Sequence, residues 1–321
     1  MTYKHLKSFL KANTISYADN FFDLIPKNIK SKIILAVGNR ASEASAYLSS
    51  IMSNMEIAHS RYIDIPTLEL KDRFIKYGVT ADTSELTALA DRIIKKCSKN
   101  ISTAELCFIL ALELLADEGE YLILEMSDEM FMRIFSGSSL SAHTVILTTL
   151  DDALTKKQAN LISLTTANIF TLSEQDDFDY ISQQTNENGV RITYSSGNKT
   201  VKFRSDLFGT VFYYNVQEFY IKSFDLNNIL PACLAVECAR ALFNAPLPLL
   251  QIGLKSTKLP RDIELFRLSP TILLCERKDF SLDHHLKFRV VTESDEILRP
   301  TENTLFCGNI EFLEKTKNAV K

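Results

Sequence analysis

Short apolar segments alternate with predicted helices along the first half of the chain, and this alternation constrains the fold more than any other feature. Lys32–Val37 (KIILAV), Tyr121–Glu125 (YLILE) and Thr144–Thr149 (TVILTT) are compact apolar runs, as expected of buried strands. Between them, Ser84–Cys97 and Thr103–Ala116 are predicted helices, and in the first one apolar residues recur at helical spacing. Strands that alternate with helices form βαβ units, so the pattern predicts an α/β fold with a parallel sheet covered on both faces.

Further segments extend the same pattern. A helix rich in Ala and Ser is predicted over Ala41–Met55, and another helix from Asp152 onward. Strands are predicted over Tyr62–Ile65 and Asn168–Leu172. The acidic stretch Asp176–Asp179 is interpreted as a solvated helix face.

The pattern changes after Asn188. Short β segments separated by turn residues predict an antiparallel meander over about residues 189–223, with strands at Arg191–Tyr194, Val201–Arg204, Val211–Tyr214 and Phe219–Ile221. Helices resume at about Asn227–Phe243 and Pro248–Leu254, and three short strands follow at Thr271–Cys275, Lys287–Val291 and Thr304–Phe306. We therefore expect a large domain over residues 1–267, which includes the meander, and a small C-terminal domain over residues 268–321.

Glycine is scarce. The chain has 9 glycines among 321 residues, and no two of them lie within seven residues of each other. A Walker-type phosphate loop needs two glycines five positions apart, and a dinucleotide-binding fingerprint needs three within six. The sequence therefore excludes both of these glycine-rich phosphate loops.

Charge and cysteine spacing exclude other classes of protein. The net charge of −4 gives no basic surplus for nucleic-acid binding. Lys4, Lys7 and Lys11 interrupt the first apolar stretch, so it lacks a signal-peptide core. No uncharged run approaches the roughly 18 residues that span a bilayer. The six cysteines contain no CxxC pair and are expected to be reduced and buried. We expect a cytoplasmic protein without a membrane or nucleic-acid partner.

Lys32–Met52 combines a hydrophobic strand, a tight loop and a helix of small residues. Several later segments follow in a fixed order: Ile65–Leu68, Asp72–Phe74, Gly78–Thr80, Thr103–Glu105, Leu124–Met126, Thr148–Asp152, Phe224–Asn228 and Pro260–Glu264. This order resembles the ATP-binding part of the Mur ligase superfamily, and within it the folylpolyglutamate synthases and dihydrofolate synthases. Those proteins have S-P-H-L, E-R-I, T-x-F-E, L-E-V-G-L-G-G, T-x-I-x-x-D-H and P-G-R-x-E at the corresponding places.

The resemblance implies a three-layer α/β/α domain of the P-loop-like type found at the centre of Mur ligases, an accessory β region, and a C-terminal domain that closes over the nucleotide. Only 57 residues follow Glu264, so the C-terminal domain is expected to be a truncated remnant, or to be supplied by another chain. The family uses Mg-ATP to phosphorylate a carboxylate, and an amine then attacks the acyl phosphate.

The phosphate loop departs from the family's G-T-N-G-K-G-[ST]. The chain has at this place Gly38, Asn39, Arg40, Ala41, Ser42 and Glu43. The lysine that bridges phosphates falls near Ala41, and the hydroxyl that holds magnesium falls near Glu43, whose carboxylate repels a phosphate in a poorly solvated pocket. In a shifted register, Arg40 and Ser42 would instead contact an anion.

Four other positions of the resemblance carry its metal and nucleotide chemistry. Glu125 stands at the family's metal-binding glutamate, and is interpreted either as that carboxylate or as a cap of the next helix. Asp152 replaces a metal-ligand histidine, Asn228 stands in the segment before a nucleotide-proximal helix, and Arg261 neighbours the position of the P-G-R arginine. No metal ligand set and no catalytic residue is predicted.

Two remaining features have ordinary interpretations. His284 and His285 are adjacent and would point to opposite faces of a strand, so we expect a solvated loop and not a metal site. Phe208–Phe224 contains seven Phe or Tyr residues, and is expected to form the core of the meander or a surface for a partner.

Together these departures predict a folylpolyglutamate-synthase-like pseudoenzyme with a degenerate ATP site, to which we assign no cofactor. Its expected role is that of an interaction or regulatory subunit, with a protein partner such as an intact ligase or a second copy, or that of a ligand-binding protein. One alternative is an active ATP-dependent carboxylate–amine ligase that binds Mg-ATP through an atypical loop. Another is a pterin- or peptide-binding module without turnover.

Overall fold

The computed structural model of the chain describes residues 1–12, 18–64, 69–97, 101–137, 140–148, 166–171, 191–194, 200–206, 208–259, 264–268, 271–275, 288–292 and 302–320. Its largest element is an eight-stranded sheet in the order β4-β3-β2-β5-β1-β6-β7-β8. The parallel strands are β1 (Lys32–Val37), β2 (His59–Tyr62), β5 (Tyr121–Met126), β6 (Ala142–Leu147), β7 (Thr166–Thr171) and β8 (Arg191–Tyr194). The hairpin of β3 (Phe74–Lys76) and β4 (Val79–Thr80) adds two antiparallel strands at one edge.

The central strand β1 is apolar because both of its faces are covered. Ile33, Leu35 and Val37 belong to one hydrophobic core, and Ile34 and Ala36 belong to the core on the opposite face. Side chains alternate between the faces of a strand, so a continuous apolar run is the signature of a strand buried on both sides. This places the start of the following loop at the centre of the carboxyl edge of the sheet.

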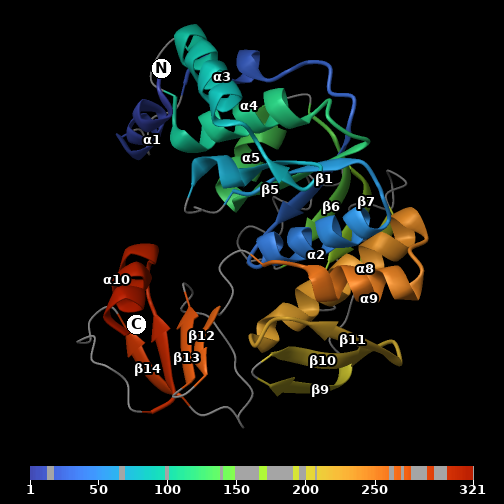
Figure 1. Cartoon of the computed structure of the whole chain (residues 1–321). Helices are drawn as coiled ribbons and strands as arrows, with labels where there is room; N and C mark the ends of the chain where they lie inside the picture. Colours follow the sequence, from blue (N-terminus) through green and yellow to red (C-terminus); the bar gives the residue numbers. More distant parts are fainter. Residues whose placement is uncertain are drawn as a thin grey trace.

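Helices form a layer on each face (Figure 1). One layer contains α2 (Ala41–Asn54), α8 (Ile229–Phe243) and α9 (Leu247–Ser256), and the other contains α1 (Tyr3–Ala12), α3 (Thr83–Lys96), α4 (Thr103–Leu115) and α5 (Asp128–Gly137). The expected three-layer α/β/α architecture with a mostly parallel sheet is confirmed.

Helix α2 is held tightly between the sheet and α9. Gly253 of α9 lies so close to α2 that a Cβ built on it would come within 2.6 Å of Ile51. Ser50 of α2 donates a hydrogen bond to the carbonyl of Gly253 at 2.8 Å. The glycine therefore permits the close approach that fixes α2, which carries several side chains of the site described below.

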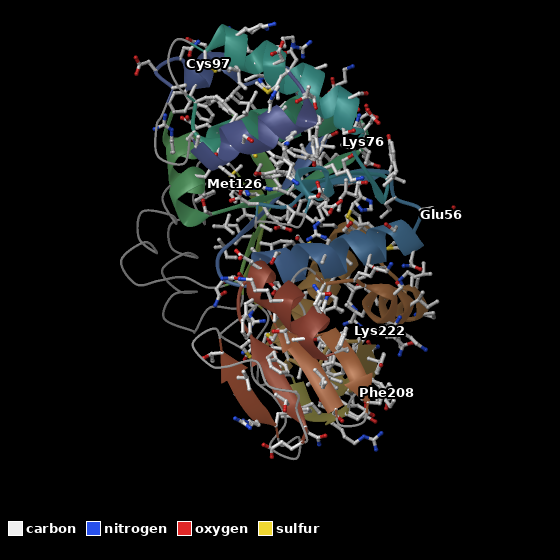
Figure 2. All side chains as sticks on the ribbon, turned by 60° about the vertical axis from the view of Figure 1, so that its left-hand side comes forward. Glu56, Lys76, Cys97, Met126, Phe208 and Lys222 are labelled. Atoms are coloured by element: carbon white, nitrogen blue, oxygen red, sulfur yellow. The ribbon has the colours of Figure 1, made fainter. Side chains whose placement is uncertain are left out.

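The accessory meander consists of β9 (Thr200–Asp206), β10 (Gly209–Tyr214) and β11 (Gln217–Ile221), all antiparallel. Phe212 and Phe219 stack with ring centroids 5.7 Å apart, and both are buried in the core shared with α8 and α9. Phe208 is exposed and lies at the outer edge of the molecule (Figure 2). The aromatic stretch is thus mainly the core of the meander.

The expected strand at Arg191–Tyr194 was assigned to the wrong sheet. It is β8, which pairs in parallel with β7 and forms the last strand of the large sheet. A short segment gives no local signal for its partner, because parallel and antiparallel strands share the same side-chain period. The prediction at Tyr62–Ile65 was also displaced, since β2 is formed by His59–Tyr62.

A third sheet of four strands lies near the C-terminus, in the order β12-β13-β15-β14. Its strands are β12 (Glu264–Leu268), β13 (Thr271–Cys275), β14 (Arg289–Thr292) and β15 (Thr304–Cys307), and α10 (Ile310–Val320) follows. One face packs on Phe312 of α10, and the other face contacts Phe224, which follows the meander. The three predicted strands are confirmed in position, whereas β12 and α10 were not expected.

Three short 3-10 helices complete the described elements: Phe21–Leu24, Leu70–Arg73 and Leu226–Asn228. In the described part of the chain, the segment Leu226–Phe243 is long and apolar enough to cross a membrane, by length and composition only. Of this segment, 56% is buried inside the fold. A core helix meets the same criteria, so the segment is weak evidence for a membrane span. The predicted helix from Asp152 and the acidic face at Asp176–Asp179 lie outside the described residues.

Candidate functional site

The loop between β1 and α2 lies at the carboxyl edge of the sheet, where open parallel sheets bind their ligands. Gly38 has a φ of 103° and Arg40 a φ of 66°. Arg40 is also the residue that precedes α2, and its side chain does not cap the helix. A non-glycine residue in this left-handed conformation costs about 1 kcal/mol or more, so the contacts of Arg40 must hold it there.

Those contacts form what we call the loop cluster: Arg40, Glu43, Asp225 and Asn228, all buried. The Arg40 guanidinium donates to a carboxylate oxygen of Asp225 at 2.7 Å and to the amide oxygen of Asn228 at 3.1 Å. A carboxylate oxygen of Glu43 lies 3.7 Å from the same guanidinium nitrogen. One guanidinium therefore faces two carboxyl groups.

Glu43 occupies the first turn of α2. The free N–H groups and the dipole of a helix favour a negative charge at this end. Glu43 is only 2% exposed, and it accepts a hydrogen bond from the Ser42 hydroxyl at 2.9 Å. The start of α2, which would attract an external anion, thus carries a carboxyl group of the chain itself.

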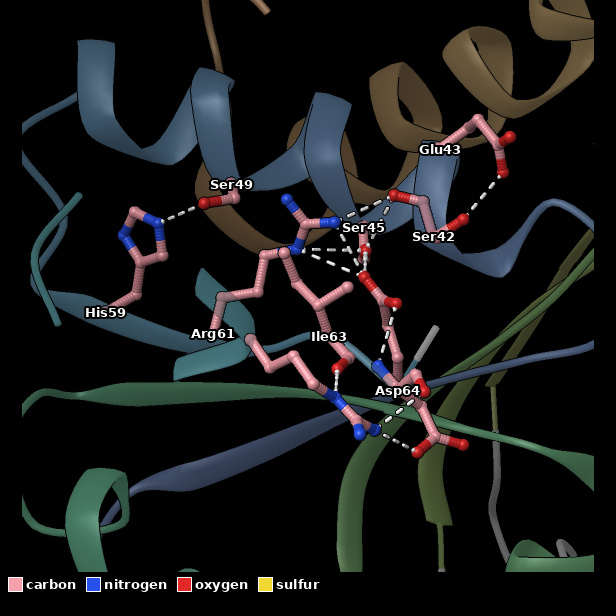
Figure 3. Close-up of polar contacts among 10 residues, drawn as sticks. Ser42, Glu43, Ser45, Ser49, His59, Arg61, Ile63 and Asp64 are labelled. Atoms are coloured by element: carbon pink, nitrogen blue, oxygen red, sulfur yellow. Dashed lines mark hydrogen bonds and ion pairs between the residues drawn. The ribbon is translucent and has the colours of Figure 1, made fainter. Parts of the chain in front are cut away.

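A second group of buried residues, the strand cluster, consists of Arg61, Glu125 and Ser45 (Figure 3). Arg61 of β2 donates to one carboxylate oxygen of Glu125 on β5 at 2.6 and 3.2 Å. The Ser45 hydroxyl of α2 donates to the same oxygen at 2.5 Å. The backbone N–H of Asp64 lies 3.3 Å from the other oxygen. Both oxygens of Glu125 therefore have hydrogen-bond donors within the chain.

A further ion pair fixes the segment after β2. The Arg73 guanidinium donates to the Asp64 carboxylate at 2.9 Å and to the Tyr62 hydroxyl at 2.7 Å. The other carboxylate oxygen of Asp64 accepts the backbone N–H of Ser127 at 3.1 Å. Burial raises the pKa of Tyr62 well above its usual value, so this hydroxyl stays protonated and acts as a donor and acceptor only.

Ser49 lies further along α2, beside His59 of β2 (Figure 3). The imidazole Nε2 is 2.8 Å from the Ser49 hydroxyl, and Nδ1 is 2.8 Å from the carbonyl of Ile57. Because a carbonyl only accepts, Nδ1 carries the proton and Nε2 accepts from Ser49. Burial lowers the pKa of His59, in agreement with a neutral ring.

The structure brings together most of the residues singled out from the sequence. Gly38 to Glu43 form the loop and the first turn of α2, Asn228 belongs to the loop cluster, and Glu125 belongs to the strand cluster. Asp152 and Arg261 lie outside the described residues.

The interpretation of Glu125 as a cap of the next helix is wrong. Ser127 takes that place at the start of α5, since its hydroxyl accepts the N–H of Met130 at 3.4 Å and its carbonyl accepts the N–H of Phe131 at 2.9 Å. The carboxylate of Glu125 instead faces Arg61.

Sequence reasoning missed Arg61, Ser45 and Asp225. Arg61 had one available signal, because it is a charged residue within a short strand next to a central one, where an unpaired charge is costly. Its partner, however, lies 64 positions away in the sequence. Among the described residues, no group of three or more His, Cys, Asp or Glu side chains is arranged to hold a metal ion.

Comparisons with known proteins identify the fold. No protein-family model matches the chain, and no curated protein sequence matches it. Solved structures do. Folylpolyglutamate synthetase from Lactobacillus casei matches with a TM-score of 0.73 and 11% identity, over 99% of this chain and 100% of that chain. An FPGS–AMPPCP complex matches with a TM-score of 0.71 and 12% identity, over 100% of this chain and 98% of that chain.

A third solved structure, Mycobacterium tuberculosis folylpolyglutamate synthase complexed with ADP, matches with a TM-score of 0.68 and 13% identity, over 86% of this chain and 70% of that chain. The chain therefore has the fold of the folylpolyglutamate synthases, as the resemblance of its motifs implied. At sequence identities of 11–13%, these comparisons establish a shared fold and nothing further.

Proposed function

We propose that this protein is a folylpolyglutamate-synthase-like pseudoenzyme, whose own side chains occupy the places where such a ligase holds phosphate and metal. The observation that carries the proposal is the pair of buried clusters at the carboxyl edge of the sheet. Solved proteins that share the fold are complexes with AMPPCP and with ADP. In this chain, the corresponding edge is closed by ion pairs between its own residues.

The loop cluster opposes phosphate binding. A phosphate at the start of α2 would lie beside Glu43 and near Asp225, and the Arg40 guanidinium already bonds to Asp225 at 2.7 Å. Two like charges about 4 Å apart repel by roughly 4 kcal/mol at the effective dielectric constant of a protein surface. Phosphoryl transfer depends on positive groups and backbone donors around the phosphates, and the described residues of the loop cluster instead place two carboxyl groups there.

The strand cluster opposes metal binding. Glu125 stands where the family resemblance places a magnesium ligand, but Arg61 neutralises it at 2.6 Å. A guanidinium cannot be deprotonated in a protein, so a divalent cation at this carboxylate would meet a permanent positive charge. The residues present therefore do not fit a Mg-phosphate group, and we assign no catalytic step to them.

Loss of turnover leaves the fold available for recognition. We propose that the protein acts as an interaction or regulatory subunit in the cytoplasm, and that its partner is another protein, such as an intact ligase or a second copy. The proposed division lies between residues 267 and 268, within β12 (Glu264–Leu268), which pairs with β13. The residues after that point would form a reduced C-terminal domain.

A ligand-binding role without turnover has one feature in its favour. A pocket of about 830 Å³ lies at the amino edge of the sheet, lined by Phe22, Ile25, Lys32, Leu140 and His143 among others. Its size suits a small ligand. A folate or pterin titration followed by thermal shift tests this role; an unchanged unfolding temperature at millimolar ligand would exclude it.

Nucleotide binding is the decisive measurement for the main proposal. Mg-ATP is titrated into the full chain by calorimetry, with an intact folylpolyglutamate synthase as the positive control. We expect no heat of binding up to millimolar nucleotide. A micromolar Kd would overturn the proposal and support the alternative, an active ATP-dependent carboxylate–amine ligase with an atypical loop.

A reverse substitution sharpens the test. Ala41→Lys with Glu43→Thr restores the residue types of a phosphate loop, and nucleotide binding should then become measurable if the clusters are what prevents it. The matched control is Glu85→Thr, which removes an exposed first-turn carboxylate from α3. Equal gains in both variants would show that general charge, and not the loop cluster, determines the affinity.

A further inference from the structure

We propose that Cys275 and Cys307 form a dithiol that reacts with peroxide and closes to a disulfide between β13 and β15. The two residues end their strands, and they are direct register partners in the parallel pair. Adjacent strands lie about 4.8 Å apart, which falls within the Cα separation of about 4.4–6.8 Å that a disulfide spans. Both side chains belong to the same core cluster, so they point to the same face.

The two thiols interact directly. A hydrogen bond with Cys275 lowers the pKa of the Cys307 thiol, against the effect of its burial. In contrast, burial raises the pKa of Cys97, Cys107 and Cys238. The thiolate is the nucleophile in sulfur chemistry, so Cys307 is the first residue expected to react and Cys275 is positioned to resolve it.

The chemistry needs a two-electron oxidant, and hydrogen peroxide is the class we name. The Cys307 thiolate attacks one oxygen, the O–O bond breaks, and hydroxide leaves, which gives a sulfenic acid at Cys307. The Cys275 sulfur then attacks the Cys307 sulfur and loses its proton, and water leaves. In total, two thiols and one peroxide give one disulfide and two water molecules.

The position of the pair gives the reaction a structural consequence. Cys275, Cys307, Leu273 and Leu305 share their cluster with Phe224, which comes from the body of the protein and not from the small sheet. Cys275 is 1% exposed and Cys307 4% exposed, so the sulfur atoms are part of this contact. Closing the disulfide draws the two sulfur atoms together beneath Phe224.

Peptide mapping tests the proposal on the intact full chain. The protein is exposed to a small molar excess of hydrogen peroxide, free thiols are blocked, and the chain is digested with trypsin. We expect Leu268–Arg277 and Val290–Lys315 to appear as one linked species, lighter by two hydrogen atoms than the two peptides together, and to separate after reduction. Oxidation of the partly exposed Cys97 while this link is absent would overturn the proposal.

Trapping of the sulfenic acid distinguishes the two roles. Dimedone should label Cys307 in the Cys275→Ser variant, whereas Cys275 should stay unlabelled in Cys307→Ser. Cys233→Ser, which removes a buried cysteine of α8, is the matched control and should form the link as the wild type does. Equal labelling of both cysteines, or pairing of either one with Cys233 or Cys238, would contradict the assignment. If a variant fails to fold, the wild-type peptide map still decides.

Discussion

The strand cluster and the loop cluster lie at the same edge of the sheet, yet they differ in their balance of charge. In the strand cluster, one guanidinium faces one carboxylate, and Ser45 and the N–H of Asp64 occupy the remaining acceptor positions. In the loop cluster, one guanidinium faces two carboxyl groups, and one of them lies as far as 3.7 Å away. Among the described residues, the first cluster pairs one cation with one anion, whereas the second brings two carboxyl groups to one guanidinium.

The difference gives the two clusters different expected roles. In the strand cluster, the Arg61 guanidinium and the Glu125 carboxylate form a buried, hydrogen-bonded pair. In the loop cluster, carboxyl groups lie at the start of α2, and their arrangement depends on tertiary structure, because Arg40 and Asp225 are 185 positions apart. We therefore expect the strand cluster to dominate stability and the loop cluster to dominate the rejection of anions.

The largest effect is expected from breaking the balanced pair. Arg61→Met leaves the Glu125 carboxylate buried without its cation, and should lower the free energy of unfolding by about 3–5 kcal/mol in urea denaturation. The double variant Arg61→Met with Glu125→Gln should recover more than half of this loss, since no buried charge remains unpaired. A double variant as unstable as the single one would show that packing, and not charge, is responsible.

A smaller loss is expected in the loop cluster. Arg40→Asn removes the guanidinium but tolerates the left-handed backbone, and should cost about 2–3 kcal/mol through the charged hydrogen bonds to Asp225 and Asn228. The same denaturation is run on Arg92→Asn, which breaks the exposed pair with Glu113 and should cost under about 1 kcal/mol. If both variants lose equally little, the loop cluster is no stronger than a surface contact.

Ser45→Ala tests how much the serine hydroxyl contributes to the stability of the strand cluster. The variant removes one hydroxyl donor to Glu125 but leaves Arg61 in place, so we expect a loss of about 1 kcal/mol. Chemical denaturation measures it. A loss as large as that of Arg61→Met would mean that the serine, and not the ion pair, organises the cluster.

The smallest effect is a dependence on pH. Burial, with a lesser contribution from the charge of Arg61, lowers the pKa of His59. The unfolded chain therefore binds a proton at His59 before the folded chain does, and stability should fall as the pH drops below the ordinary histidine value of about 6.5. His59→Gln should flatten the unfolding temperature between pH 5 and 7. If the unfolding temperature of His59→Gln changes with pH as steeply as that of the wild type, the pH dependence belongs to other titratable groups.

Local patterns predicted the fold better than the site. KIILAV and YLILE identified β1 and β5 because burial on both faces leaves apolar residues at all positions except Lys32 and Glu125, which lie at the start of the first run and at the end of the second. The loop residues and Glu125 were singled out because they lie at the end of such strands or directly after them. Arg61 and Asp225 were missed as site residues because their roles come from partners 64 and 185 positions away. No local period or spacing encodes a pairing of that kind.

Phe224 and Asp225 are consecutive residues that face two different parts of the molecule. Phe224 packs into the face of the C-terminal sheet that contains Cys275 and Cys307, and Asp225 holds Arg40 at the start of α2. One peptide bond thus joins the residue that packs on the C-terminal sheet to the residue that bonds to Arg40 of the loop. A displacement of the C-terminal sheet that moves Phe224 would therefore reach Asp225, and through it Arg40, across a single peptide bond.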